Sequence, residues 1–132
     1  VYDMGLTNRT EAAGLAVAQA SRLAAGLMRE RLSGVYTVDD ATLFQHLLRA
    51  HEAEGLRIEP SAAAGLEGPL RLTQSAIGRA WLEQTGLLAQ LPQATHVAWT
   101  TGGSLLPDSE FDRFLARGRG LSATATAGAA AS

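Results

Sequence analysis

Apolar residues recur at helical spacing in several stretches of the chain. Leu43 and Phe44 precede Leu47 by four and three residues, which places all three on one face of a helix. Asp39 is a favoured N-cap residue before this face, and Gly55 is a favoured stop after it. The same reasoning predicts helices over residues 13–31, 39–55, 61–64, 73–84 and 107–118.

Three of these helices are predicted to end at residues that break helices. Gly34 follows the first helix, Gly65 and Pro69 interrupt the third, and Gly118 ends the last. Residues 119–132 are rich in Ser, Ala, Thr and Gly and contain little to bury. This composition predicts a disordered tail.

Short runs of β-branched and aromatic residues lie between the predicted helices. They cover residues 35–38, 56–58 and 95–100 and are predicted to be strands. Strands that alternate with helices favour parallel pairing, and a parallel sheet is normally covered by helices on both faces. The predicted fold class is therefore α/β, with a partial parallel sheet and flanking helices that form part of a larger sheet.

Composition excludes several kinds of chemistry. The 132 residues include no Cys, which rules out disulfides, thiol catalysis and Cys-ligated zinc. All eleven basic residues are Arg, so no lysine of this chain can form an imine with a cofactor. No metal site is predicted.

Charge and hydropathy also narrow the range of partners. The formal net charge is −2 and the arginines are spread among carboxylates, so the chain lacks the basic patch typical of nucleic-acid binding. No apolar run reaches the roughly 18 residues needed to cross a bilayer. The sequence favours a cytoplasmic protein that binds neither nucleic acid nor a membrane.

The first candidate site follows the third predicted strand, at Thr101, Gly102 and Gly103. In α/β sheets ligands bind beyond the carboxyl ends of strands, and glycines let the backbone approach a ligand closely. A threonine hydroxyl can both donate and accept a hydrogen bond. The alternative interpretation is a tight turn from strand to helix.

The second candidate is the pair Glu59 and Ser61, at a strand end before a helix. The carboxylate could orient a ligand, or the two residues could simply cap and charge the start of the helix. The histidines are weaker candidates for a functional site. His46 and His51 are too far apart around a helix to share a metal ion, with His51 predicted to pack and His46 to be exposed. His96 would be a proton-transfer group only with a partner.

Four separated blocks of the chain resemble one enzyme family. Residues 5–17, 34–37, 55–62 and 94–107 closely resemble the C-terminal part of D-serine ammonia-lyase, also called D-serine dehydratase. The resemblance implies a fold-type II pyridoxal-phosphate enzyme (tryptophan synthase β-like), in which D-serine loses water by β-elimination to yield pyruvate and ammonia. Residues 1–118 would then be the C-terminal part of the pyridoxal-phosphate catalytic domain, before the tail.

The resemblance also assigns the cofactor-binding residues. Thr101 matches the threonine of the family's Trp-x-Thr-Gly-Gly segment and would lie against the pyridine nitrogen of the cofactor, with Gly102 and Gly103 giving the ring room. Two positions depart from the family pattern. Ala13 stands where relatives have Asp, and Ser104 replaces the third glycine.

In this family the imine-forming lysine, the glycine-rich phosphate loop and the acidic cation ligand all lie N-terminal to the matched region. The expected partners are therefore the missing N-terminal part of the enzyme and D-serine, and the chain alone is expected to be inactive. Two alternatives remain. In the first, the chain is a non-enzymatic remnant or an interaction domain. In the second, it belongs to a related dehydratase that acts on another hydroxy-amino acid such as D-threonine.

Overall fold

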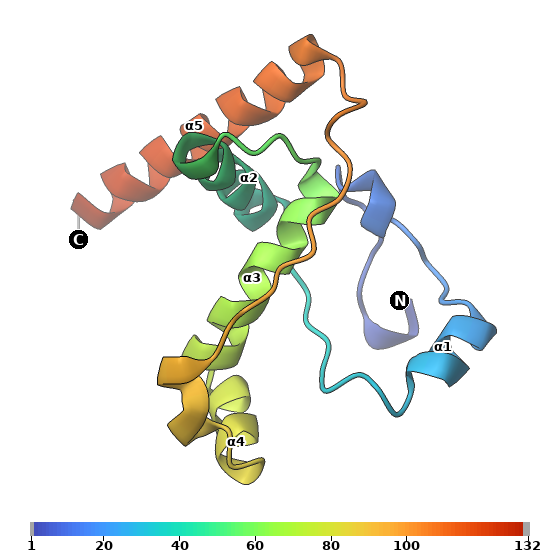
Figure 1. Cartoon of the computed structure of the whole chain (residues 1–132). Coiled ribbons are helices and arrows are strands. Elements are labelled where there is room, and N and C mark those ends of the chain that lie inside the picture. Colours follow the sequence, from blue (N-terminus) through green and yellow to red (C-terminus); the bar gives the residue numbers. More distant parts are fainter. Residues whose placement is uncertain (1, 131–132) are drawn as a thin grey trace.

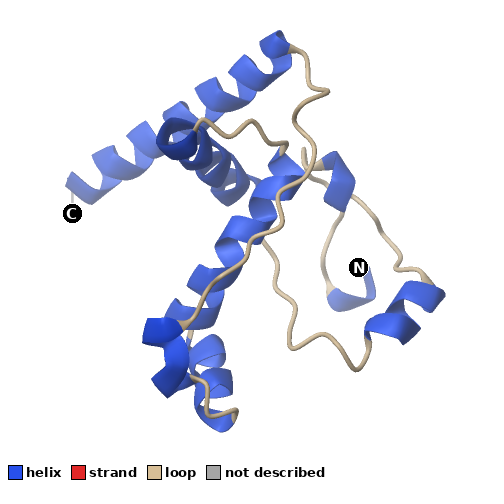
Figure 2. Ribbon diagram, in the orientation of Figure 1, coloured by secondary structure: helices blue, strands red, loops and turns tan. Residues whose placement is uncertain are grey.

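The computed structural model describes residues 2–130 of the chain, with side chains described as far as residue 123. Its α-helices and 3-10 helices (η) follow one another without an intervening strand in that range (Figure 2). In chain order they are η1 (Tyr2–Met4), η2 (Ala13–Leu15), α1 (Arg22–Met28), α2 (Asp40–Glu54), α3 (Pro60–Gln74), α4 (Ala76–Gln84), η3 (Leu88–Gln93) and α5 (Asp108–Ala130).

Helix α3 runs through the middle of the structure (Figure 1). Its N-terminal end lies near the crossing of α2 and α5, and α4 lies at its other end. The N-terminal arm, which we define as residues 2–38, carries η1, η2 and α1 out to one side. The helical core is defined as α2, the start of α3 and the first half of α5.

The predicted partial parallel sheet is wrong, because no residue between 2 and 130 belongs to a strand. Segments 35–38, 56–58 and 95–100 are loops, and no backbone hydrogen bond of the described residues joins two of them. Two of these segments contact α3 instead. The Tyr36 hydroxyl donates to the Ala64 carbonyl at 2.9 Å, and the Trp99 carbonyl passes close to Gly65. A β-prone segment forms a strand only beside another strand, and within this chain each segment lies against a helix.

The prediction for α2 is confirmed, because its ends carry local signals. The Asp39 side chain accepts a hydrogen bond from the Thr42 backbone N–H at 2.9 Å, and Gly55 ends the helix with a left-handed φ of 66°. The first predicted helix is wrong over much of its length. Only Ala13–Leu15 and Arg22–Met28 are helical there.

The predicted breaks in the third and last helices are also wrong. Helix α3 runs through Gly65 and Pro69, and α5 runs through Gly118 over most of the segment expected to be a disordered tail. A Cβ on Gly118 would lie 2.7 Å from the Phe44 carbonyl oxygen and 2.9 Å from the Leu48 Cβ, so this glycine allows α2 and α5 to cross closely. The division of the chain at residue 118 stays a prediction, and residues 131–132 lie outside the described residues.

The hydrophobic core lies where α2, α3 and α5 meet. The Phe44 and Phe114 rings pack with their centroids 5.6 Å apart, across the crossing of α2 and α5. Burial of one such side chain contributes on the order of 2 kcal/mol. The buried members are Phe44, Leu47, Leu48, Ile58, Ala62, Ala63, Phe111, Phe114 and Leu115.

Candidate functional site

Three segments that are far apart in the sequence meet at the first turn of α3. Glu59 occupies the N-cap position and Ser61 lies in the first turn, yet the Glu59 side chain makes no capping hydrogen bond. Instead, Glu59 Oε1 accepts a hydrogen bond from the Ser61 hydroxyl at 2.8 Å. The Glu59 carboxylate is therefore turned away from the helix amides and is available to the neighbouring segments.

The first neighbouring segment is the double-glycine loop, which we define as residues 100–106. A Cβ on Gly102 would lie 2.7 Å from the Glu59 carboxyl carbon, and a Cβ on Gly103 would lie 2.1 Å from the Arg57 carbonyl oxygen. Both glycines also have positive φ angles, of 71° and 89°. Space and backbone conformation both require glycine here, because the loop packs tightly against residues 57–59.

The second neighbouring segment comes from the N-terminal arm. A Cβ on Gly14 would lie 2.8 Å from the Ser61 hydroxyl oxygen and 3.7 Å from Glu59 Oε1. Ala13, where the sequence departs from the family pattern, is the exposed residue before it. The start of α3 thus gathers three of the four blocks that the sequence comparison singled out.

Arg57 holds the double-glycine loop from one side. Its Nε donates to the Gly103 carbonyl at 3.2 Å and its Nη2 donates to the Leu106 carbonyl at 2.5 Å. The guanidinium also pairs with Asp108 at 3.0 Å and lies 4.6 Å from the centre of the Phe111 ring. One half-buried arginine therefore joins the segment before α3, the loop and the start of α5.

Thr101 lies at the exposed edge of this arrangement. Its side chain is exposed, and its hydroxyl forms no hydrogen bond to any other part of the chain that the structure describes. A hydroxyl in this position can donate to an acceptor on a bound molecule.

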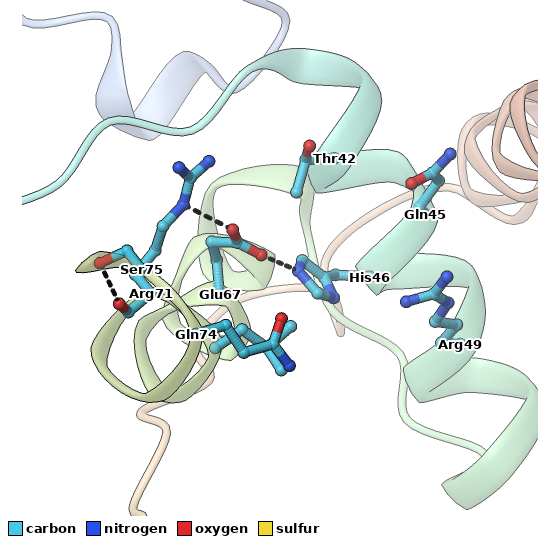
Figure 3. A pocket seen from close by; sticks show the side chains of 9 residues that line it. Thr42, Gln45, His46, Arg49, Glu67, Arg71, Gln74 and Ser75 are labelled. Atoms are coloured by element: carbon cyan, nitrogen blue, oxygen red, sulfur yellow. Dashed lines mark hydrogen bonds and ion pairs between the residues drawn. The ribbon is translucent and has the colours of Figure 1, made fainter. Parts of the chain in front are cut away.

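A second polar cluster lies farther along α3, beside a cavity of about 400 Å³ (Figure 3). His46 Nε2 lies 2.7 Å from Glu67 Oε2, and Arg71 Nε lies 2.6 Å from Glu67 Oε1. Because a carboxylate only accepts hydrogen bonds, both neighbours donate to Glu67. The predicted exposure of His46 is wrong, since it is 7% exposed. The cluster ties α2 to α3.

The other two histidines differ in their surroundings. His51 packs edge-on against Phe111, with ring centroids 5.1 Å apart, which confirms its predicted packing role. His96 is exposed and forms no ion pair or hydrogen bond within residues 2–123. A proton-transfer role for His96 therefore lacks a positioned partner in this part of the chain.

Comparison with known proteins gives one consistent result. No protein-family model matches the chain. A protein of Paracidovorax citrulli named probable D-serine dehydratase is 64% identical over 92% of the chain, and one of Sinorhizobium medicae with the same name is 58% identical over 87%. A third, from Burkholderia pseudomallei strain 668, is 54% identical over 98% of the chain.

The chain is similar to a C-terminal portion of proteins named D-serine dehydratase. It spans about a quarter of the length of the curated relatives it matches, 27% of the first and 26% of the second. Because the match to the Burkholderia pseudomallei protein covers 98% of the chain, it includes all four sequence blocks that carried the resemblance. No described helix has both the length and the apolar character to span a membrane.

Sequence reasoning gave no role to Arg57 or Glu67, although both organise polar contacts in the structure. Arg57 lies inside one of the family blocks, but its partners are 46 and 49 residues away along the chain. Glu67 and Arg71 are four residues apart, which signals a helical ion pair only if the helix continues past Gly65. Because the sequence predicted that the helix ends at Gly65, it did not predict the ion pair between Glu67 and Arg71.

Proposed function

We propose that this chain is the C-terminal segment of a D-serine ammonia-lyase, which converts D-serine to pyruvate and ammonia by pyridoxal-phosphate-dependent β-elimination. The observation that carries the proposal is the convergence of the family blocks at the start of α3. Glu59, Ser61, Gly14 and Gly102 come from three blocks and lie within contact distance there. Identity of 54–64% to proteins named D-serine dehydratase supports the same reading.

The residues at the double-glycine loop fit the pyridine edge of the cofactor in their chemistry. The pyridine nitrogen is a hydrogen-bond acceptor, and the exposed Thr101 hydroxyl is a donor with no partner in the described part of the chain. When bound, pyridoxal phosphate supplies an electron sink for the elimination. A neutral hydroxyl does not stabilise a protonated ring as a carboxylate would, so Thr101 keeps that sink weak and favours elimination over transamination.

The chain supplies one side of the site only. It contains no lysine, so the residue that forms the imine must come from the N-terminal part of the enzyme. We propose that the chain by itself neither binds the cofactor covalently nor releases pyruvate, and that Thr101, Gly102 and Gly103 complete the site when the two parts assemble.

Complementation tests this function. The chain is co-expressed with the portion of the Paracidovorax citrulli relative that precedes the matched region, and pyruvate release from D-serine and from D-threonine is measured. Turnover by the pair, with none by either part, supports the proposal. Faster turnover of D-threonine than of D-serine would indicate that D-threonine is the preferred substrate. No turnover of either amino acid would favour the non-enzymatic alternative.

Substitution at the loop tests the role of Thr101. Thr101→Ala should lower pyruvate release by the pair by about ten- to a hundredfold, because a positioned polar contact to the cofactor is lost. Thr95→Ala, in the same extended segment but exposed and away from the glycines, is the matched control. Equal turnover by both variants and the unaltered pair would show that Thr101 does not contribute to the cofactor site.

A further inference from the structure

The double-glycine loop contains few hydrogen bonds between its own residues. Between Thr100 and Leu106 one backbone hydrogen bond is formed, from the Leu106 N–H to the Gly103 carbonyl at 3.2 Å. Glycines at two successive positions with positive φ also make the backbone intrinsically mobile. Something outside the loop must therefore select its conformation.

Arg57 makes the contacts that do so. Its Nε and Nη2 bind the Gly103 and Leu106 carbonyls, which are the two ends of the same turn. Its own carbonyl oxygen packs against Gly103 so closely that no Cβ would fit. Side chain and main chain of one residue thus enclose Gly103, two residues after Thr101.

The guanidinium is itself held in one orientation. It lies 4.6 Å from the Phe111 ring centre, which sets the plane of the fork, and Asp108 at 3.0 Å neutralises its charge. A lysine cannot reproduce this geometry, because its ammonium is a point donor without a planar fork. The Asp108 carboxylate is 93% exposed, so the ion pair contributes less than the two bonds to backbone carbonyls.

We propose that Arg57 is a positioning residue that fixes the double-glycine loop and thereby places the Thr101 hydroxyl. The importance of that hydroxyl rests on the proposed function, whereas the clamp itself is a property of this chain. Arg57 acts through the loop, since its Nε and Nη2 donate to backbone carbonyls of the loop.

Amide hydrogen exchange of the full 132-residue chain tests the clamp without any cofactor. In Arg57→Met the Leu106 amide should exchange at least tenfold faster than in the unaltered chain, while the α2 amides keep their protection. Arg113→Met is the matched control, because Arg113 also lies over a phenylalanine ring of α5, 5.4 Å from the centre of Phe114, but contacts no loop carbonyl. Unchanged exchange at Leu106 with α2 protected would overturn the proposal.

Arg57→Lys keeps the proposal falsifiable if Arg57→Met loses the fold. It retains charge and most of the apolar stem, so α2 protection should stay, and Leu106 exchange should lie between that of the unaltered chain and that of a fully released loop. Exchange of Leu106 equal to that of the unaltered chain in Arg57→Lys would show that no bidentate contact is needed.

The assembled pair tests the consequence for the site. Arg57→Lys should reduce kcat about tenfold or more with little change in KM for D-serine, and should alter the absorption spectrum of the bound cofactor in the same direction as Thr101→Ala. If the unaltered pair shows no turnover, the proposed function fails while the exchange experiment still decides the clamp. If the pair turns over and Arg57→Lys leaves both kcat and spectrum unchanged, the positioning role fails alone.

Discussion

The helical core and the N-terminal arm are held in place by different kinds of contact. In the core, large side chains such as Phe44 and Leu47 are fully buried. In the arm, large apolar side chains lie open, with Met4 75%, Leu23 74% and Val35 83% exposed. Hydrophobic burial therefore stabilises the core and contributes little to the arm within this chain.

Polar contacts at a few points attach the arm to the core. The Thr10 hydroxyl donates to Asp40, and the Glu11 backbone N–H donates to the same carboxylate at 2.9 Å. Glu11 also pairs with Arg117 of α5. Such contacts are each worth about 1 kcal/mol, so the arm should open at a lower free-energy cost than the core.

The difference between arm and core has a direct meaning under the proposed function. A chain that spans about a quarter of its relatives packs the surfaces that its own residues can cover and leaves the others open. Under that proposal, the exposed apolar residues of the arm would face the remaining part of the enzyme. The variants below measure how separate the two regions are.

Truncation in the core should have the largest effect. Phe44→Ala removes a ring that packs against Phe114 and lies under the Arg117 guanidinium, and should lower the free energy of unfolding by about 3–5 kcal/mol. Val35→Ala in the arm should change it by less than about 0.5 kcal/mol. Urea denaturation followed by circular dichroism measures both, and similar values for the two would abolish the distinction between core and arm.

The glycine at the crossing of α2 and α5 should come next. In Gly118→Ala the new Cβ meets the Phe44 backbone, so the helices must separate, at a cost of about 1–3 kcal/mol. Gly120→Ala is the matched control, since nothing lies within 4 Å of a Cβ there, and it should stabilise the helix by up to about 1 kcal/mol. Thermal unfolding should shift in opposite directions, and a shift of the same sign in both variants would contradict the crossing role.

Gly118 also shows how far the sequence could go. A glycine after an amphipathic helix usually ends it, and the same rule gave the correct end of α2 at Gly55. At Gly118 the helix continues, because the missing Cβ is needed for contact with Phe44, 74 residues earlier. Local signals at helix ends are readable from sequence, whereas close approach of a distant backbone is not.

The candidate site divides in the same way. Thr101, Gly102 and Gly103 could be singled out because the residue types themselves suggest the chemistry, and Glu59 and Ser61 because they precede a helix. That these residues meet, and that Arg57 holds them, depends on loops crossing the start of α3. The expected sheet failed for a related reason, since β-prone segments such as 95–100 need strand neighbours that residues 2–130 do not supply.

Loosening the attachment of the arm should have a smaller effect. Thr10→Val keeps the shape of the side chain but removes the hydroxyl that donates to Asp40 and accepts from the Ala12 N–H at 3.0 Å. We expect faster amide exchange at Glu11 and Ala12, corresponding to about 1 kcal/mol, with α2 exchange unchanged. Thr7→Val, at an exposed position of the arm, is the control. Equal loss of protection in α2 would show that arm and core open together.

The smallest effect should lie at the junction of the two regions, where Asp39 directly follows the arm and caps the first helix of the core. The Thr42 backbone N–H donates to the Asp39 carboxylate and lowers its pKa. Because the folded pKa lies below the unfolded one, Asp39 contributes stability above its ordinary pKa of about 3.9, and this contribution is lost as the pH falls through the folded pKa. An NMR titration of the Asp39 carboxyl carbon, identified by its absence in Asp39→Asn, should give a midpoint below 3.9. A midpoint at or above that value would mean that the cap does not hold the junction in solution.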